Sequence, residues 1–451
     1  MNFRNLNAVN INSINILILL FPFSLIAGNL FVNLNIALIC LLGVWIYKED
    51  IFKIKKFIST NIILVFFIIV IVMSALKSNS IGNTDGFLKS ILYLRYLLFL
   101  YILKFALEKK HLNVKYFLMT CLFITLFVSL DVTLQGLTGK NIFGLESLGK
   151  HNSSIFGKEL VAGSYIQRFF IFGLICLPFV WNKLNNKRYF LISVLILIFF
   201  LGALFSGNRI SLVMFVLAIF LMIFLFKNLR KSLLAGSLFC LLIFSFLYSK
   251  NENIKKHYSA FYKYSIDTLI TLKRFSTKEY PELEDEKYKF FIKEYNKGKD
   301  REKLKEAYEM VPFASGHQVV FLTAIDVWAD NIFLGNGIKS FGKTCKTKLH
   351  LPNRVCETHP HNYYLELLND TGLIGALTFV ISIIYLCFIK FKNLRKGDDL
   401  QKLLFYCLLI ILFIEFFPLK SSGSFFSTGN SSFIFFIIGL TAGLKSFLKK
   451  N

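Results

Sequence analysis

Residues 190–205 read FLISVLILIFFLGALF, and residues 61–76 read NIILVFFIIVIVMSAL. Each run approaches the roughly 20 apolar residues that an α-helix needs to cross the hydrocarbon core of a bilayer. A helix is the expected structure, because lipid offers no hydrogen-bond partner to an irregular backbone. Of the 451 residues, 55% are hydrophobic and 18% are charged, whereas about a quarter are charged in soluble domains. The composition therefore favours a helical membrane protein over a large soluble enzyme.

The hydrophobic pattern predicts an all-α polytopic membrane protein with twelve transmembrane spans. We expect these spans near residues 11–28, 31–47, 61–77, 87–107, 116–134, 166–182, 189–206, 209–226, 232–249, 372–390, 401–418 and 432–448. The first two spans are so close together that one re-entrant pair is the alternative. The first span follows a polar, nearly uncharged N-terminus without a small-residue cleavage site, so we expect an anchor rather than a cleaved signal.

Basic residues gather in the connections on one side of the predicted spans. They are Lys48, Lys53, Lys55, Lys56, Lys109, Lys110, Lys115, Lys183, Lys187, Arg188, Lys227, Arg230, Lys231, Lys390, Lys392, Arg395, Lys396, Lys445, Lys449 and Lys450. Because basic connections mark the cytoplasmic side, we expect both termini in the cytoplasm. Much of the net charge of +25 is this topology signal, so the charge does not indicate a nucleic-acid partner.

Two longer polar segments fall on the predicted outer side, at residues 135–165 and 250–371. Within the second, residues 278–310 read KEYPELEDEKYKFFIKEYNKGKDREKLKEAYEM, and the spacing of Tyr and Phe there predicts amphipathic helices over the membrane domain. The chain thus divides into residues 1–249 with nine spans, the large loop 250–371, and residues 372–451 with three spans. Long loops of this kind usually carry function.

Histidines and two cysteines are concentrated in these outer segments. Six of the seven histidines fall there, namely His151, His257, His317, His350, His359 and His361, whereas His111 is on the cytoplasmic side. Cys345 and Cys356 lie eleven positions apart in the large loop, in a compartment that permits disulfides. We expect a disulfide between them, with two free thiols or a metal site as alternatives. Close cysteine pairs with zinc-ligand spacing are absent from the sequence.

Three arginines lie inside or beside predicted spans, where a charge is costly and therefore informative. Arg168 in GSYIQRFF and Arg209 in FSGNRISLV stand at outer ends of spans, and Arg95 in LYLRYLLF stands in the middle of one. Interfacial anchoring is the structural alternative for Arg168 and Arg209. A buried pair with a carboxylate such as Asp131 is the alternative for Arg95.

The stretch HPHNYYLELLNDTG, residues 359–372, places polar side chains before an apolar run. Pro360 is tolerated only near a helix start, and Gly372 is a suitable helix end, so we expect a short helix with His361 and Asn362 in its first turn. An imidazole can accept the proton of an attacking hydroxyl, while guanidinium groups bind diphosphate through paired hydrogen bonds. The alternatives are a histidine that only caps the helix, or a metal site of His359 and His361 assisted by Cys356 or His350.

This region resembles the O-antigen ligase and polymerase superfamily, whose hallmark is a long periplasmic loop ending in PHN-x-x-L before a membrane helix. HPHNYYLELLNDTGLIG (359–375) fits that pattern, AIDVWADNIFLGNGIKSF (324–341) is similar to the family's G-x-G segment, and SGNRISLV (206–213) is similar to its arginine segment. The resemblance implies transfer of a glycan from an undecaprenyl-diphosphate carrier to an acceptor hydroxyl, without cofactor or metal. It also implies a bacterial inner-membrane protein with a periplasmic active site, surrounded by membrane lipid.

Within this resemblance, His361 is the expected catalytic base of an inverting displacement. Arg209, Arg168, Arg95 and Arg274 are the expected diphosphate-binding cations, and His317, His359 and Asn362 complete the expected substrate-binding set. The chain departs from the family at His317, which stands where an arginine is common, and at Asn331-Ile332, where Asn-Pro is common.

The resemblance favours an O-antigen ligase that uses lipid A–core as the acceptor. A polymerase, which uses another carrier-linked repeat, and a protein O-oligosaccharyltransferase share the same motifs. A polysaccharide or lipid transporter without chemistry is the alternative from another class. Transporters more often show paired repeats and broken helices at the membrane midplane, which this sequence does not show.

Overall fold

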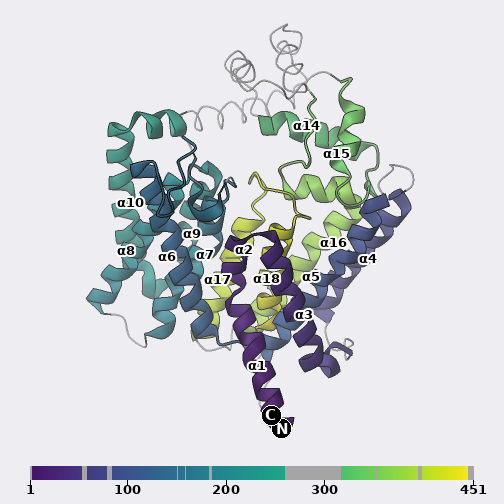
Figure 1. Ribbon diagram of the computed structural model, residues 1–451, viewed down its shortest axis with the longest axis horizontal. Helices are drawn as coiled ribbons and strands as arrows, with labels where there is room; N and C mark the ends of the chain where they lie inside the picture. The colour runs from purple at the N-terminus through teal and green to yellow at the C-terminus, as the bar shows by residue number, and fades with distance from the viewer. Residues whose placement is uncertain are drawn as a thin grey trace.

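The computed structural model describes residues 3–52, 58–78, 84–149, 151–157, 159–181, 185–259, 316–351, 354–394 and 399–444. These residues are predominantly helical (Figure 1). Within them no strand forms, and an isolated bridge between Lys140 and Glu146 is the extent of β-structure. The all-helical fold class predicted from the sequence is confirmed.

The helices follow the hydrophobic runs of the sequence. They are α1 (Phe3–Leu19), α2 (Phe21–Ala27), α3 (Asn29–Phe52), α4 (Ile58–Ser78), α5 (Thr84–Glu108), α6 (Val114–Thr138), α7 (Ala162–Val180), α8 (Asn186–Phe205), α9 (Arg209–Leu225), α10 (Arg230–Lys250), α14 (Gly316–Ala329), α15 (Phe341–Thr344), α16 (Tyr363–Leu394), α17 (Asp399–Glu415) and α18 (Thr428–Gly443). Short 3₁₀ turns lie at Ser154–Phe156, Lys227–Leu229 and Cys345–Lys348.

Seven of the described helices are long and apolar enough to cross a membrane. An eighth candidate is the pair α1–α2, which is bent by 49° at a short break. Other apolar helices, such as Arg209–Leu225 and Thr428–Gly443, are shorter than that test requires. A multi-pass membrane protein follows from these helices, while the count of twelve spans stays a prediction.

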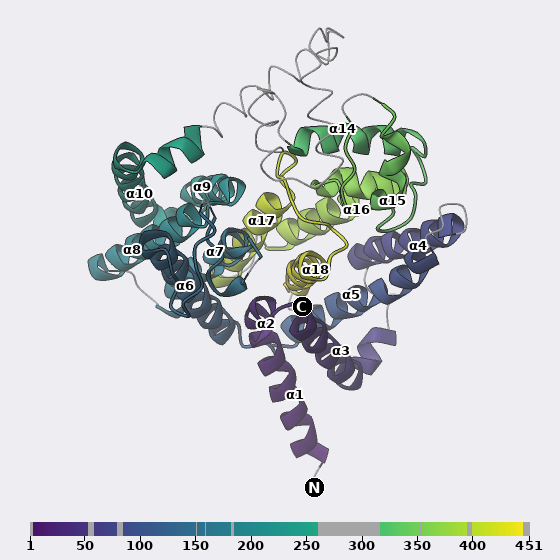
Figure 2. The ribbon, with the colours of Figure 1, turned by 45° about the horizontal axis from the view of Figure 1, so that its top comes forward.

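Helix α18 lies at the centre of the molecule (Figure 2). It packs on α5 along one side and on α17 and α16 along others, while α6 to α10 form a group beyond α17. Phenylalanines fill the contacts: the rings of Phe21 and Phe436 stack with centroids 4.2 Å apart, and Phe117 packs on Phe436 at 5.6 Å. Because α18 packs on α5 along one side and on α17 along another, residues on opposite faces of α18 face different groups of helices.

Helices α14 and α15 form a layer at one end of the long helices, and α1 begins and α18 ends at the opposite end (Figure 1). The described part of the large loop thus lies at the opposite end of the helices from the start of α1 and the end of α18, while the cytoplasmic position of the termini stays a prediction. Residues 278–310 and Arg274 lie outside the described residues, so the predicted amphipathic helices stay a prediction.

The backbone of the G-x-G segment crosses α16 and fixes the first part of that helix. The helix is interrupted at Gly372, with φ 63° and ψ −174°, where the predicted short helix ends. Gly335 and Gly337 of the G-x-G segment also have positive φ. A Cβ atom on Gly335 would overlap the backbone at Gly372, and one on Gly372 would overlap the backbone of Phe333. The two backbones therefore approach as closely as only glycines permit.

Hydrogen bonds close this crossing on both sides of the break. The amides of Asn336 and Gly337 donate to the carbonyls of Asn369 and Asp370, each at 2.8 Å. Beyond the break, the amide of Leu373 donates to the carbonyl of Ile332 at 2.8 Å. The G-x-G segment thus provides hydrogen-bond partners for backbone groups that have none within the interrupted helix. It also holds in place the short helix at whose start the PHN residues lie.

Candidate active site

His361 lies in a sharp turn immediately before α16. Its φ is +56°, in the left-handed region that few residues other than glycine adopt. Its carbonyl accepts a hydrogen bond from the amide of Ser422 at 2.8 Å. The loop between α17 and α18 therefore fixes the backbone that carries the imidazole.

Asn362 forms the cap of α16. Its Oδ1 accepts hydrogen bonds from the amides of Tyr364 at 3.0 Å and Leu365 at 3.2 Å. Its Nδ2 donates to the carbonyls of Pro418 at 2.9 Å and Lys420 at 3.3 Å. The amide group is thus fully engaged within the protein, and the structure supports a positioning role for Asn362 rather than the substrate contact expected from the sequence.

The imidazole of His361 is half-buried beside a second imidazole. The ring centroids of His359 and His361 are 4.2 Å apart, and Oγ1 of Thr358 lies 3.0 Å from Nδ1 of His359. Burial, followed by the proximity of His359, lowers the pKa of His361 to about 4. At neutral pH the ring is therefore uncharged, which is the state that a proton acceptor requires.

Arg168 on α7 lies in a buried ion-pair network. Its Nη2 donates to Oε1 of Glu415 at 2.6 Å and to Oδ1 of Asn430 at 2.7 Å. The hydroxyl of Tyr363, two residues after His361, lies 3.2 Å from Nη2 of Arg168 and donates to Glu415 at 2.9 Å. The sequence suggests a diphosphate ligand or an interfacial anchor at this position. In the structure Arg168 is instead the partner of a buried carboxylate.

Lys420 is a second cation on the same carboxylate. Its Nζ donates to Oε2 of Glu415 at 2.8 Å, and the side chains of Lys420 and Glu415 are 7% and 2% exposed. Arg168 and Lys420 thus share one carboxylate, which leaves one net positive charge beside the turn of His361. Neither Glu415 nor Lys420 is among the site residues expected from the sequence, although a carboxylate inside a predicted span is a signal that a cation lies nearby.

Arg209 begins α9 close to this network. Asn208 caps the helix by accepting a hydrogen bond from the amide of Ser211, and its Nδ2 lies 3.3 Å from Oγ of Ser164. Ser164 stands one turn before Arg168 on the same face of α7. Nε of Arg209 lies 3.3 Å from Nε2 of His257. Packing of α7 against α9 therefore brings the start of α9 near Arg168, as the sequence suggests for these two arginines.

Arg95 lies on the other side of α18. Arg168 stacks on Phe433 of α18, whereas Tyr96, which touches the guanidinium of Arg95, stacks on Phe435. Residues 433 and 435 point to opposite faces of a helix, since each residue turns it by about 100°. The structure thus does not bring Arg95 together with Arg168 and Arg209.

The alternative pairing of Arg95 with Asp131 is wrong. Asp131 accepts hydrogen bonds from the amide of Ile142 at 2.9 Å and from Oγ of Ser154 at 2.5 Å, and Asn141 lies 3.3 Å away. Its carboxylate holds the outer loop after α6, far along the chain from Arg95. Helical spacing alone does not identify this role, because the partners come from a loop.

Cys345 and Cys356 form a disulfide with Cα atoms 5.2 Å apart, which is the pairing expected from the sequence. Cys356 is therefore not available as a ligand beside His359. Among the described residues no group of three or more His, Cys, Asp and Glu side chains is arranged to hold a metal ion. His317 is the second residue of α14, and its side chain lies outside what the structure describes, as does the whole of Arg274.

The comparison with known families agrees with this geometry. Residues 192–380 match the family model described as O-antigen ligase. The matched segment begins in α8, ends in α16, and includes Arg209, the G-x-G crossing and the His361 turn. No curated protein matches the chain. Over residues 192–380 the chain is thus similar to the O-antigen ligase family, which supports the resemblance to the O-antigen ligase and polymerase superfamily.

Proposed function

We propose that this protein is an O-antigen ligase, which transfers a glycan from an undecaprenyl-diphosphate carrier to a hydroxyl of lipid A–core at the periplasmic face of the inner membrane. The observation that carries the proposal is the juxtaposition of a neutral imidazole and a cationic network. His361 is uncharged at neutral pH, and Tyr363, two residues later, contacts the Arg168–Glu415–Lys420 network.

In the proposed reaction, a ring nitrogen of His361 accepts the proton of the acceptor hydroxyl. The hydroxyl oxygen forms a bond to the anomeric carbon, and the bond from that carbon to the diphosphate oxygen breaks. The electron pair of the broken bond stays on the diphosphate, so one displacement inverts the anomeric centre. No general acid is needed when cations stabilise the leaving group.

Arg209 is the first candidate for the diphosphate contact. The net positive charge of the Arg168 network lies one turn of α7 from Ser164, which contacts Asn208 at the start of α9, and it adds to the attraction for the diphosphate. A guanidinium suits this role because its fork matches two phosphate oxygens. A bound diphosphate also changes His361: negative charge nearby favours the imidazolium, so donor binding raises the pKa of the base. The base is thus strengthened when the substrate is in place.

The test is transfer of carrier-linked glycan by purified variants, with EDTA present. His361→Asn is the sharpest substitution, because Asn tolerates positive φ but has no basic nitrogen. We expect a loss of about 100- to 10,000-fold in turnover with the fold retained, the range for removal of a positioned base. His359→Asn is the matched control and should lose far less. Near-normal turnover by His361→Asn, or inactivation of the unaltered protein by EDTA, would overturn the mechanism.

The acceptor is tested separately in a deletion strain. Accumulation of carrier-linked polymer with loss of all long-chain lipopolysaccharide supports the ligase. Lipopolysaccharide with a single repeat supports a polymerase instead, and intact lipopolysaccharide with loss of protein-linked glycan supports a protein O-oligosaccharyltransferase.

A further inference from the structure

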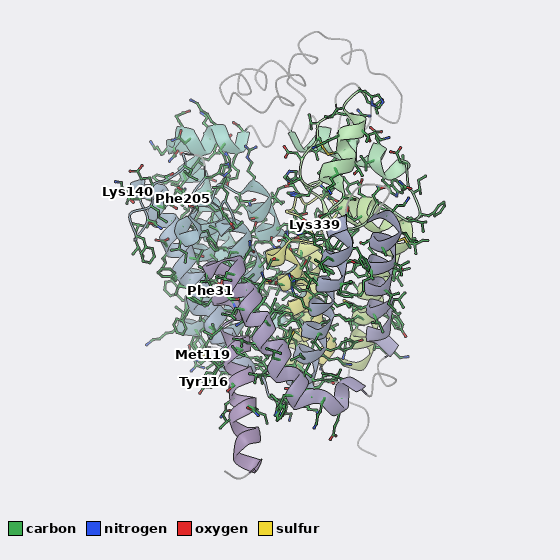
Figure 3. All side chains as sticks on the ribbon, turned by 45° about the vertical axis from the view of Figure 1, so that its right-hand side comes forward. Phe31, Tyr116, Met119, Lys140, Phe205 and Lys339 are labelled. Carbon is green, nitrogen blue, oxygen red and sulfur yellow. A yellow bond between two sulfur atoms is a disulfide. The ribbon has the colours of Figure 1, made fainter. Side chains whose placement is uncertain are left out.

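The backbone just before Arg209 is capped by residues from two loops. Helix α8 ends at Phe205 (Figure 3), and the last carbonyl groups of a helix have no partner within it. The hydroxyl of Tyr258 donates to the carbonyl of Leu204 at 3.2 Å, and Nδ2 of Asn152 donates to that of Phe205 at 2.5 Å. Asn152 lies in the loop after α6 and Tyr258 at the start of the large loop, so both segments hold the turn that precedes Arg209.

His257 extends this capping and also contacts Arg209. Its Nε2 lies 2.9 Å from the carbonyl oxygen of Gly207 and 3.3 Å from Nε of Arg209. The residue is buried, with 6% of its surface exposed, and its ring packs edge-on against that of His151 with centroids 5.7 Å apart. One nitrogen of His257 thus contacts both the turn and the guanidinium that follows the turn.

The two contacts of Nε2 require different forms of the imidazole. A carbonyl oxygen only accepts hydrogen bonds, so the contact with Gly207 needs a proton on Nε2. The Nε–H of an arginine only donates, so the contact with Arg209 needs a lone pair on Nε2. A neutral ring nitrogen provides one or the other. A glutamine amide, in contrast, carries an acceptor oxygen and a donor nitrogen, so it can make both contacts at once.

We propose that His257 is a positioning residue for Arg209 and holds its guanidinium in the orientation that meets the donor diphosphate. This inference rests on the proposed function, in which Arg209 is the first candidate for that contact, and it adds a residue of the large loop to the donor site. A long side chain loses rotational freedom when it binds a ligand, which reduces affinity. A contact at Nε removes part of this freedom before the lipid arrives. Because the ring is buried, His257 acts through Arg209 rather than by contact with the lipid.

The alternative is that His257 only caps the end of α8. Tyr258 separates the two roles, because its hydroxyl caps the carbonyl of Leu204 at the same helix end. If capping alone matters, loss of the Tyr258 hydroxyl and loss of the His257 nitrogen have the same effect on donor binding. If positioning matters, the loss of the nitrogen is the more damaging change.

The experiment measures binding of undecaprenyl diphosphate, without a glycan, to the purified full-length protein in nanodiscs. His257→Phe keeps a ring that packs against His151 but has no nitrogen, and it should weaken binding by about 10-fold, the scale of one hydrogen bond to a charged group. His257→Gln should restore most of the affinity, because its amide can make both contacts. Tyr258→Phe is the matched control and should bind like the unaltered protein.

A double variant distinguishes positioning from an independent effect on the fold. Arg209→Gln alone should weaken binding by about 10- to 100-fold, and the addition of His257→Phe should cause no further loss, since no guanidinium is left to position. A further 10-fold loss in the double variant, or equal losses for His257→Phe and Tyr258→Phe, would overturn the inference. Where His257→Phe fails to fold, His257→Asn takes its place, because its shorter amide does not reach the position of Nε2.

The same measurements separate this inference from the proposed function. Unchanged binding of undecaprenyl diphosphate by Arg209→Gln would show that the proposed donor contact is wrong, and the inference would fall with it. Weakened binding by Arg209→Gln together with unchanged binding by His257→Phe would overturn the inference alone.

Discussion

Replacing Gly372 by alanine tests whether the G-x-G crossing holds the short helix at the start of α16. The conformation at Gly372, φ 63° and ψ −174°, is one that only glycine adopts readily, and another residue there costs about 1–3 kcal/mol. The new methyl group would also overlap the backbone of Phe333, which cannot rotate away as a side chain can. Separating the two segments breaks the hydrogen bonds from Asn336, Gly337, Leu373 and Ile374, each worth about 0.5–1.5 kcal/mol. The expected total is about 3–9 kcal/mol, a large part of the stability of a typical protein.

Gly28→Ala is the matched control. Gly28 has φ 101° and ψ 176°, and nothing lies within 4 Å of an added Cβ atom, so this variant pays the conformational cost alone. Both variants are heated in detergent, and the surviving monodisperse fraction is measured by size-exclusion chromatography. Gly28→Ala should shift the midpoint slightly, whereas Gly372→Ala should lose most of the folded protein at the same temperature. Equal midpoints for the two variants would refute the account of the crossing.

Further predictions concern the base, the buried ion pairs, the disulfide and the topology. The pKa of His361 is lowered to about 4, and a general base works only when it is unprotonated. We therefore expect kcat/KM for transfer to stay constant from neutral pH down to about pH 5 and to fall below that. A decrease in kcat/KM that begins near pH 6.5, about the pKa of an unperturbed histidine, would contradict this prediction. Glu415→Gln leaves two buried cations without a carboxylate and should destabilise the protein by about 3–5 kcal/mol in the same heating assay, whereas Glu146→Gln, in an exposed pair, should have little effect. Non-reducing mass spectrometry should find the Cys345–Cys356 peptide, a link worth about 3 kcal/mol, and alkylation of both thiols without reductant would exclude it. A cysteine at Glu252 should react with an impermeant reagent in intact cells, and one at Lys231 only after permeabilisation; the reverse would invert the topology.

Much of the fold can be predicted from local sequence. Apolar runs mark where helices lie, because burial of a continuous hydrophobic segment depends on composition rather than on partners. Pro360 and Gly372 mark the two ends of the short helix, because each residue acts through the conformation of its own backbone and needs no distant partner. The motifs around Arg209 and His361 also identify the region that the family model matches.

The partners of charged residues could not be predicted in this way. Arg168 meets Glu415 only because α7, α17 and α18 pack together, and no spacing in the sequence expresses that contact. Asp131 likewise finds its partners in a loop, and Asn362 uses both ends of its amide within the fold. A residue type and its position in a span therefore indicate that a partner exists, whereas the identity of the partner depends on tertiary packing.

The pairing of Arg168 with Glu415 has a consequence for biogenesis. The two residues are 247 positions apart, so at about 5–20 residues per second the ribosome needs roughly 12–50 s to reach the carboxylate after it has made the arginine. During that interval α7 occupies the bilayer with an uncompensated guanidinium, which can reach interfacial water because it stands in the second turn of its helix. The centre of the protein therefore closes last, when α17 and then α18 arrive from the translocon. A nascent chain that stops before α17 retains an unpaired cation in a membrane helix, and membrane quality control can act on this feature.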